Sequence, residues 1–200
     1  NNGFNFDFSS IKKTVGHKVL FTNISRIIPY KGHLFLIELF SKILEKRKDI
    51  VLQIIGDTLP NYNTFLNQLK LKVKEYNAEK NIIFLGYRTD IKSILSKSNF
   101  FIHTPVDPDP FPTVIFEAIE SKTPVISTDN GGAREILDDF NNGLLIDHND
   151  INKSMQLILN YINDSDLQQN NIGNSMKFIS DNFNKQKFSK KLISLISSFE

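Results

Sequence analysis

Cysteine is absent from the 200-residue chain, which excludes a disulfide framework and thiol chemistry. No apolar run approaches the ~18 residues that a membrane-spanning helix needs. Neither a Gly-x-Gly-x-x-Gly nor a Walker sequence occurs, so no sequence motif supports binding of a dinucleotide or of ATP. A strong charge of one sign is also missing, because the net charge is +2 and no long basic run occurs. The composition therefore gives no support to nucleic-acid binding.

What the chain does contain is the composition of an ordinary globular domain, with 40% hydrophobic and 23% charged residues. Short β-branched and apolar runs alternate with segments of helical periodicity. The predicted strands are residues 18–24, 50–55, 82–85, 100–103, 125–128 and 144–146. The predicted helices are residues 33–47, 62–76 and 90–97, one that starts near Pro112, one after Gly131–Gly132, and a helical tail from Ile151 with breaks near Asp164 and Gly173. This alternation predicts an α/β fold with a doubly wound, Rossmann-like parallel sheet.

Ligands of such sheets bind beyond the carboxyl ends of the strands. The loops that follow the first, third and fourth predicted strands are polar: SRIIPYKG, GYRTD and HTPVDPDP. Because these strand ends share one edge of a parallel sheet, we expect the three loops to form a ligand site together.

The stretch from residue 107 to 137 contains a proline-rich loop followed by a helix, and Pro112 can occupy the first turn of that helix. A helix N-terminus offers unpaired N–H groups and partial positive charge to an anion such as a diphosphate. Two acids, Asp109 and Glu117, stand eight positions apart across this junction, and Thr113 lies one turn before Glu117. Carboxylates suit hydroxyl groups, so a nucleotide sugar, which carries both a diphosphate and hydroxyls, fits the pattern.

The run Asp109-Pro-Phe-Pro-Thr-Val-Ile-Phe-Glu117 resembles the donor-site motif of the retaining family 4 glycosyltransferases, usually Glu-x-Phe-Gly-x(4)-Glu. These enzymes have two facing Rossmann-like domains, the GT-B architecture. The segments PVISTDNGGAREI and NGLLID that follow are similar to the family in order and spacing. Two departures stand out: the first acid is Asp rather than Glu, and Pro112 replaces a glycine.

The resemblance implies a diphosphate site. It assigns Arg26 and Lys31 to contact the donor diphosphate, and the N–H groups of Thr113 and Val114 to the distal phosphate. An anion between Lys31 and the following helix would also offset the unfavourable position of a cation at a helix N-terminus. Arg26 and Lys31 lie on a polar loop, so we expect their substitution to leave the fold intact.

The remaining parts of the donor follow from the same resemblance. It implies that Glu117 binds the ribose, that Asp109 and the N–H of Phe111 contact the transferred sugar, and that the backbone of Tyr87 and Arg88 lies near the base. Asp109, Glu117, Arg26 and Lys31 are then the catalytic set. No metal or other cofactor is expected.

Some residues near these motifs are expected to have other roles. Glu120, one turn after Glu117, should lie outside the site, and Gly131–Gly132 should serve a turn and close packing. His103 ends a strand at the ligand edge, where a satisfied core histidine is the commoner outcome. The other histidines, His17, His33 and His148, have no spacing that suggests a metal site.

The N-terminal run NNGFNFDF resembles the interdomain segment of the family. We therefore expect residues 1–16 to be that segment and residues 17–200 to be the nucleotide-sugar-binding domain, with the N-terminal acceptor domain absent from this chain. Such a piece should bind donor but transfer sugar poorly or not at all. The whole protein is expected in the cytoplasm, with any attachment to the inner membrane surface made through the absent domain.

The sequence thus predicts the donor-binding part of a retaining, metal-independent glycosyltransferase that acts on a glycan or lipid-linked acceptor in polysaccharide or glycoconjugate biosynthesis. Two alternatives remain open. One is another GT-B enzyme, a nucleotide-sugar epimerase or a sugar phosphorylase. The other is a non-enzymatic flavodoxin-like or receiver-type module, although the loop after the first strand carries Arg26 and Lys31 where a receiver needs acids. The base, the sugar and the acceptor are not determined by the sequence.

Overall fold

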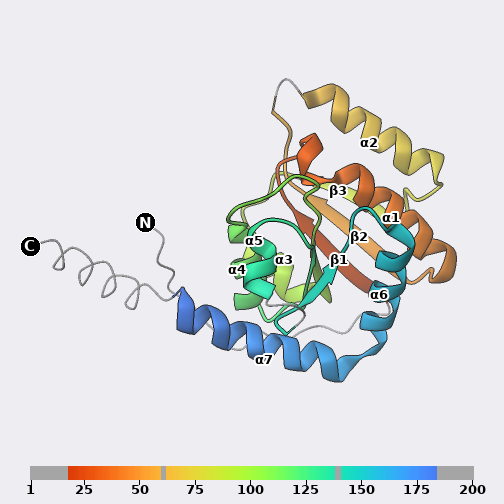
Figure 1. Cartoon of the computed structure of the whole chain (residues 1–200). Coiled ribbons are helices and arrows are strands. Elements are labelled where there is room, and N and C mark those ends of the chain that lie inside the picture. Colours follow the sequence, from red (N-terminus) through yellow and green to blue (C-terminus); the bar gives the residue numbers. More distant parts are fainter. Residues whose placement is uncertain (1–17, 60–61, 138–140, 184–200) are drawn as a thin grey trace, which may run out of the picture.

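The computed structural model describes residues 18–59, 62–137 and 141–183 (Figure 1). Its strands form one sheet in the order β3-β2-β1-β4-β5-β6, and every neighbouring pair is parallel. The strands are β1 (Val19–Ile24), β2 (Ile50–Ile55), β3 (Ile82–Gly86), β4 (Phe100–His103), β5 (Val125–Thr128) and β6 (Leu144–Ile146). The predicted doubly wound parallel sheet is confirmed.

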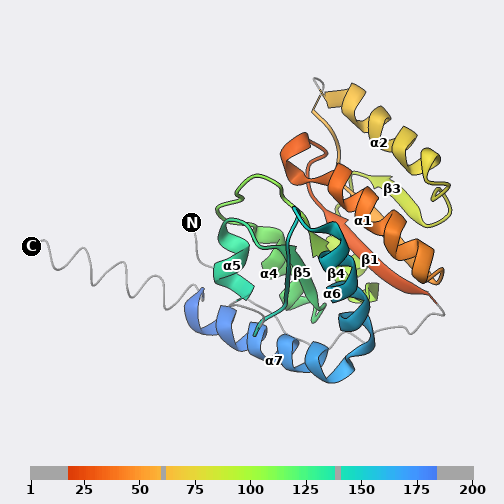
Figure 2. The same cartoon turned by 45° about the vertical axis from the view of Figure 1, so that its right-hand side comes forward.

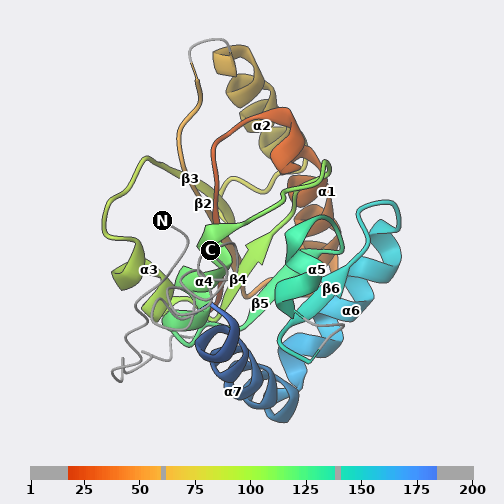
Figure 3. The ribbon, with the colours of Figure 1, turned by 60° about the vertical axis from the view of Figure 1, so that its left-hand side comes forward.

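Helices cover both faces of the sheet, as Figures 1 and 3 show. They are the 3-10 helix η1 (Pro29–Lys31) and the α-helices α1 (His33–Lys46), α2 (Asn63–Glu75), α3 (Ile91–Lys97), α4 (Thr113–Glu120), α5 (Gly132–Leu137), α6 (Ile151–Asn163) and α7 (Ser165–Asn182). Helices α1, α2 and α6 contribute to one hydrophobic cluster, and α3, α4, α5 and α7 contribute to a second. The sheet therefore has a core on each face.

The packing of α1 illustrates how the sequence pattern produces these cores. Its predicted apolar side is buried throughout: Leu36, Ile37, Phe40, Ile43 and Leu44. The ring of Phe21 on β1 lies 5.0 Å from that of Phe40 and 4.8 Å from that of Phe100 on β4, measured between centroids. Burying each such apolar side chain stabilises the fold by roughly 1.5–3 kcal/mol. The packing of α1 against Phe21 and Phe100 therefore holds β1 and β4 in place.

The strand order reverses between β1 and β4, which are neighbours although they lie far apart in the chain (Figure 2). The connections after these two strands run to opposite sides of that point and leave a crevice at the carboxyl ends, where doubly wound folds bind ligands. The fold thus positions the loops after β1 and β4 on either side of one site.

The helical tail departs from prediction at one of its two expected breaks. Asp164 does separate α6 from α7, and its carboxylate accepts a hydrogen bond from the N–H of Leu167 at 2.9 Å. The break near Gly173 is wrong, because α7 continues through it. A glycine inside a helix costs about 1 kcal/mol relative to alanine, and the packing of the opposite side of α7, around Ile179, outweighs that cost. The expected interdomain segment, residues 1–16, lies outside the described residues.

Candidate functional site

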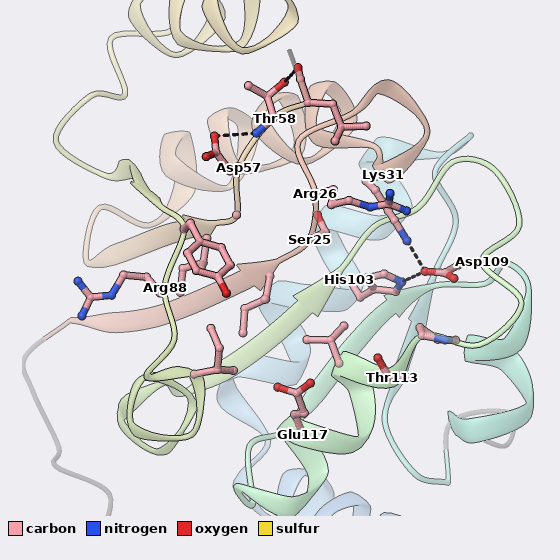
Figure 4. Close-up of a pocket in the computed structure, with 18 of the residues that line it drawn as sticks. Ser25, Arg26, Lys31, Asp57, Thr58, Arg88, His103, Asp109, Thr113 and Glu117 are labelled. Atoms are coloured by element: carbon pink, nitrogen blue, oxygen red, sulfur yellow. Dashed lines mark hydrogen bonds and ion pairs between the residues drawn. The ribbon is translucent and has the colours of Figure 1, made fainter. Parts of the chain in front are cut away.

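A pocket of about 560 Å³ opens at the carboxyl ends of β1, β2, β3 and β4 (Figure 4). All of the residues that the sequence assigned to the donor site line it: Arg26, Lys31, Tyr87, Arg88, Asp109, Phe111, Thr113, Val114 and Glu117. They come from the loops after β1, β3 and β4 and from the first turns of α4. The tertiary structure therefore brings into one cavity residues that are spread over more than ninety positions of the chain.

The N-terminus of α4 forms one wall of the pocket. Pro112 is the residue before the helix, with φ −74°, and its carbonyl accepts a hydrogen bond from the N–H of Ile115 at 3.0 Å. No side chain caps the helix start, so the N–H groups of Thr113 and Val114 stay available to a ligand. Thr113 and Glu117 are exposed and one turn apart, as predicted.

Asp109 is the most strongly held acid of the pocket. Its Oδ2 lies 2.5 Å from Nζ of Lys31 and 3.3 Å from Nε2 of His103. The contact with His103, together with that of the Lys31 ammonium, holds the pKa of the Asp109 carboxyl far below its usual range, although burial opposes the shift. Asp109 is therefore ionised at neutral pH and paired on one oxygen.

Two side chains at and just after the end of β5 hold the loop that carries Asp109. The hydroxyl of Thr128 donates to the carbonyl of Pro105 at 2.7 Å, and Nδ2 of Asn130 donates to the carbonyl of Val106 at 3.0 Å. On the other side, the N–H of Val106 donates to the carbonyl of Tyr30 at 3.0 Å. The loop after β4 is thus tied to both of its neighbours in space.

The glycine pair of the β5–α5 connection approaches the loop more closely still. Gly131 has φ +58°, and a Cβ there would lie 2.5 Å from the carbonyl oxygen of Asp109 and 2.6 Å from its nitrogen. A Cβ at Gly132 would lie 2.3 Å from the carbonyl oxygen of Pro110, and the N–H of Gly132 donates to the carbonyl of Asp109 at 2.8 Å. The predicted role of Gly131–Gly132 in a turn and close packing is confirmed, and the partner is the loop of Asp109.

Arg26 and Lys31 lie on the same side of the pocket, on the connection between β1 and α1 (Figure 4). Arg26 is exposed and makes no ion pair with any residue that the structure describes. Lys31 differs, because its side chain is only 17% exposed and is paired with Asp109. The sequence did not reveal this pairing, and because Asp109 would lose its closest partner, we expect substitution of Lys31 to cost some stability while the fold is kept.

Glu117 lies on the opposite side of the pocket, on α4 (Figure 4). Its side chain is open to solvent, but the pocket walls desolvate the carboxylate enough to raise its pKa, with a smaller contribution from the negative charge of Glu120. Glu120 itself does not line the pocket and lies 3.7 Å from Nζ of Lys92 on α3. The prediction that Glu120 falls outside the site is confirmed.

Tyr87 and Arg88 follow β3 at the far end of the pocket. Tyr87 is 73% exposed. The guanidinium of Arg88 makes two hydrogen bonds of 2.8 Å to the carboxylate of Asp90, and Figure 4 shows its side chain directed away from the other charged groups of the pocket. The Arg88 side chain is therefore engaged by Asp90 and not by the charged groups on the other walls of the pocket.

The structure adds pocket residues that sequence reasoning missed. Asp57 and Thr58 follow β2, whose end shares the same edge, and the N–H of Thr58 donates to Oδ1 of Asp57 at 2.8 Å. Ser25 and His103 also line the cavity. His103 is buried as expected, but neither of its ring nitrogens has a hydrogen-bond partner of ordinary geometry, so it is not the satisfied core histidine that the sequence suggested. The signal for Asp57 was available, because Gly56–Asp57 closes a strand of the same parallel sheet.

Neither a metal cluster nor a membrane span emerges from the described part of the chain. Among those residues, no group of three or more His, Asp or Glu side chains is arranged to hold a metal ion. None of the described helices is long and apolar enough to cross a bilayer.

With this geometry in hand, comparisons with known proteins give a consistent result. The family described as Glycosyl transferases group 1 matches residues 6–178. Among curated proteins, the UDP-Gal:alpha-D-GlcNAc-diphosphoundecaprenol alpha-1,3-galactosyltransferase of Escherichia coli is 30% identical over 149 residues, which cover 72% of this chain and 37% of that protein. The uncharacterized glycosyltransferase MJ1059 of Methanocaldococcus jannaschii is 34% identical over 119 residues, which cover 59% and 28% of the two chains.

Solved structures agree in fold. The crystal structure of Anabaena Alr3699/HepE in complex with UDP superposes with a TM-score of 0.84 at 24% identity and covers 91% of this chain and 49% of that one. The C-terminal domain of a glycosyl transferase group 1 family protein, LpcC from Francisella tularensis, superposes with a TM-score of 0.76 at 24% identity, covering 90% of this chain and all of that domain. The present chain therefore has the fold of the C-terminal half of GT-B proteins, and it spans less than half the length of the two curated relatives named above.

Proposed function

The chain belongs to the Glycosyl transferases group 1 family, and from that premise we propose that it forms the donor-binding half of a glycosyltransferase. The donor is a nucleotide diphosphate sugar, and the UDP complexes of a protein with the same fold favour UDP as the nucleotide. The reaction transfers the sugar with retained anomeric configuration and without a metal. The acceptor is a glycan or lipid-linked saccharide, in polysaccharide or glycoconjugate biosynthesis.

The observation that carries the proposal is the arrangement of positive charge in the pocket. Arg26 and Lys31 lie on one side, and the uncapped N-terminus of α4 offers the N–H groups of Thr113 and Val114 on another. A diphosphate between them would be neutralised without a metal ion. As the bond to the sugar breaks, negative charge grows on the leaving diphosphate, and one preorganised partner of such charge is typically worth about 3–4 kcal/mol in the transition state.

The two acids then divide the hydroxyl groups of the donor. Glu117 lies on α4 beside the phosphate position and accepts from the ribose. Asp109, with Oδ2 occupied by Lys31 and His103, presents its other oxygen to the transferred sugar, next to Phe111. The segment at Tyr87 and Arg88 borders the base.

Lys31 has two partners in this scheme, Asp109 and the diphosphate. An ammonium carries three N–H donors, so it can bridge both anions at once. The donor's negative charge would then partly replace the charge of Asp109 at Lys31. Because Lys31 is shared, binding of the diphosphate would affect how firmly Asp109 is held.

The proposal assigns the acceptor and the groups that orient it to an N-terminal domain of the same protein. This chain alone should therefore bind donor and transfer sugar poorly or not at all. A cytoplasmic location, with membrane contact through the N-terminal domain, stays a prediction.

Titration calorimetry of this chain with UDP, GDP and ADP, with EDTA present throughout, tests the proposal. We expect one nucleoside diphosphate to bind, with an affinity that falls as salt rises, since screening weakens the charge interactions. Arg26→Ala should weaken this binding, whereas Lys92→Ala, on α3 outside the pocket, should not. Binding that requires added magnesium or manganese would contradict the metal-free mechanism, and an absence of binding for all three nucleotides would contradict the donor site.

A further inference from the structure

His103 lies where an apolar residue would be expected. It ends β4, a strand buried along its whole length, and its own side chain is only 1% exposed. Its ring stacks on that of Phe101, with an interplanar angle of 14° and 6.4 Å between centroids. Both ring nitrogens are buried without a hydrogen bond of ordinary geometry, which costs stability. A leucine at this position would avoid that cost, which indicates that the imidazole makes an interaction that a leucine cannot make.

Of the two ring nitrogens, Nε2 is the one directed at Asp109, although this contact lacks ordinary hydrogen-bond geometry. The Nε2 atom lies 3.3 Å from Oδ2 of Asp109, and Figure 4 shows His103 and Lys31 reaching that oxygen from two sides. The groups that face the imidazole are Asp109, Lys31 and His33. Burial lowers the pKa of His103, and Asp109 only partly offsets this, so the ring is neutral at physiological pH with one proton to donate.

The two partners of Asp109 differ in what a donor does to them. Lys31 is a cation in the proposed phosphate site, so a bound diphosphate competes for its charge. His103 is neutral and buried beneath the acid, so a diphosphate does not draw it away. When Lys31 shares its charge with phosphate, its hold on Asp109 weakens, and His103 is the contact that is not diverted.

We propose that His103 is a positioning residue for sugar transfer: its Nε2–H holds Oδ2 of Asp109 while Lys31 engages the diphosphate, so that Oδ1 stays directed at the sugar. This inference rests on the donor site proposed above. It predicts that His103 affects the sugar part of the donor and not the nucleotide.

The test compares the affinities of this chain for UDP and for UDP-glucose, UDP-galactose and UDP-N-acetylglucosamine. For the sugar nucleotide that binds best, His103→Leu should lower affinity about fivefold or more, while UDP affinity changes less than about twofold. His103→Gln, whose amide N–H can occupy the place of Nε2–H, should restore most of the loss. Ile102→Val, which trims a buried side chain of the same strand, controls for packing changes in β4.

A double-mutant cycle separates positioning from mere packing. If His103 acts through Asp109, His103→Leu should have no further effect on UDP-sugar affinity in an Asp109→Ala background. Equal losses for UDP and UDP-sugar, additive effects of the two substitutions, or failure of His103→Gln to restore affinity would overturn the inference. Wild-type protein that binds none of the nucleotides would instead contradict the donor site itself, so the two failures are distinguishable.

Discussion

The two acids of the pocket, Asp109 and Glu117, are held in opposite ways. Asp109 is paired with Lys31 and His103 on a loop tied to the β5–α5 connection, and its pKa is lowered. Glu117 projects from a helix, open to solvent, and its pKa is raised by partial burial and by Glu120. The fold favours the ionised form of Asp109 and slightly disfavours the ionised form of Glu117. The difference indicates that the protein itself fixes the position of Asp109, whereas among the described residues no cation lies beside Glu117 to lower the pKa of that carboxyl.

The largest effect on stability should come from Gly131→Val, because it disturbs the close packing of Gly131 against the backbone of Asp109. A β-branched residue at φ +58°, with its Cβ within 2.6 Å of the Asp109 backbone, cannot fit without moving the loop. We expect the free energy of unfolding to fall by roughly 3 kcal/mol or more. Urea denaturation measures the change.

Gly173→Ala is the matched control for that substitution. Gly173 lies in α7, and a Cβ there would meet nothing within 4 Å. Alanine should therefore raise the free energy of unfolding by up to about 1 kcal/mol through helix propensity. A Gly131→Val protein as stable as the wild type would show that the loop of Asp109 is not held by close packing.

The next largest effect concerns the ion pair. Lys31→Met leaves Asp109 without its closest partner, and we expect a loss of about 2 kcal/mol. That is less than the 3–5 kcal/mol typical of fully buried pairs, because the two side chains keep 17% and 16% exposure. Arg26→Met on the same connection should change stability by less than about 0.5 kcal/mol. Equal melting temperatures for both variants would return Lys31 to the status of an ordinary surface cation.

The pH dependence of stability should have opposite signs for the two acids. The folded pKa of Asp109 is lowered, so its stabilisation is present above the unfolded value of about 3.9 and is lost as the pH falls below it. Asp109→Asn should therefore be least different from wild type in acid. The folded pKa of Glu117 is raised, so its ionisation opposes folding as the pH rises through about 4.3.

For Glu117→Gln we accordingly expect a slight gain over wild type above about pH 5 and none in acid. Urea denaturation of both variants and the wild type between about pH 2 and pH 7 gives the two slopes. Slopes of the same sign would contradict the contrast between the acids.

The last comparison of the two acids concerns ligand affinity and not stability. Glu117→Ala should weaken the binding of UDP and of UDP-sugar by similar factors, because both ligands contain the ribose. The expected loss of binding free energy is roughly 1–3 kcal/mol. Asp109→Ala should weaken UDP-sugar more than UDP, because only the sugar loses a partner. Paired calorimetric titrations of each variant decide. If Asp109→Ala reduces both affinities alike, Asp109 holds the loop and does not touch sugar.

Local patterns in the sequence were sufficient for the elements and for most of the pocket lining. The periodicity of apolar residues located every described strand to within one residue, and the rule for parallel sheets identified the edge on which the pocket lies. The choice of Asp109 and Glu117 over Glu120 came from their spacing together with the resemblance to the donor-site motif of the family, and both acids line the pocket whereas Glu120 does not. The break expected at Gly173 failed because tertiary packing outweighed a weak local preference.

What the sequence by itself determined is the alternation of strands and helices and the edge of the sheet on which the pocket lies, and its resemblance to a family indicated most of the residues gathered there. What only the tertiary structure decided is how those residues are paired. Lys31 and Asp109 are 78 positions apart, and Asp109 meets His103 only because its loop folds back against Gly131–Gly132. Ion pairing depends on distances of a few ångströms between side chains, and no local periodicity encodes such distances across a sheet.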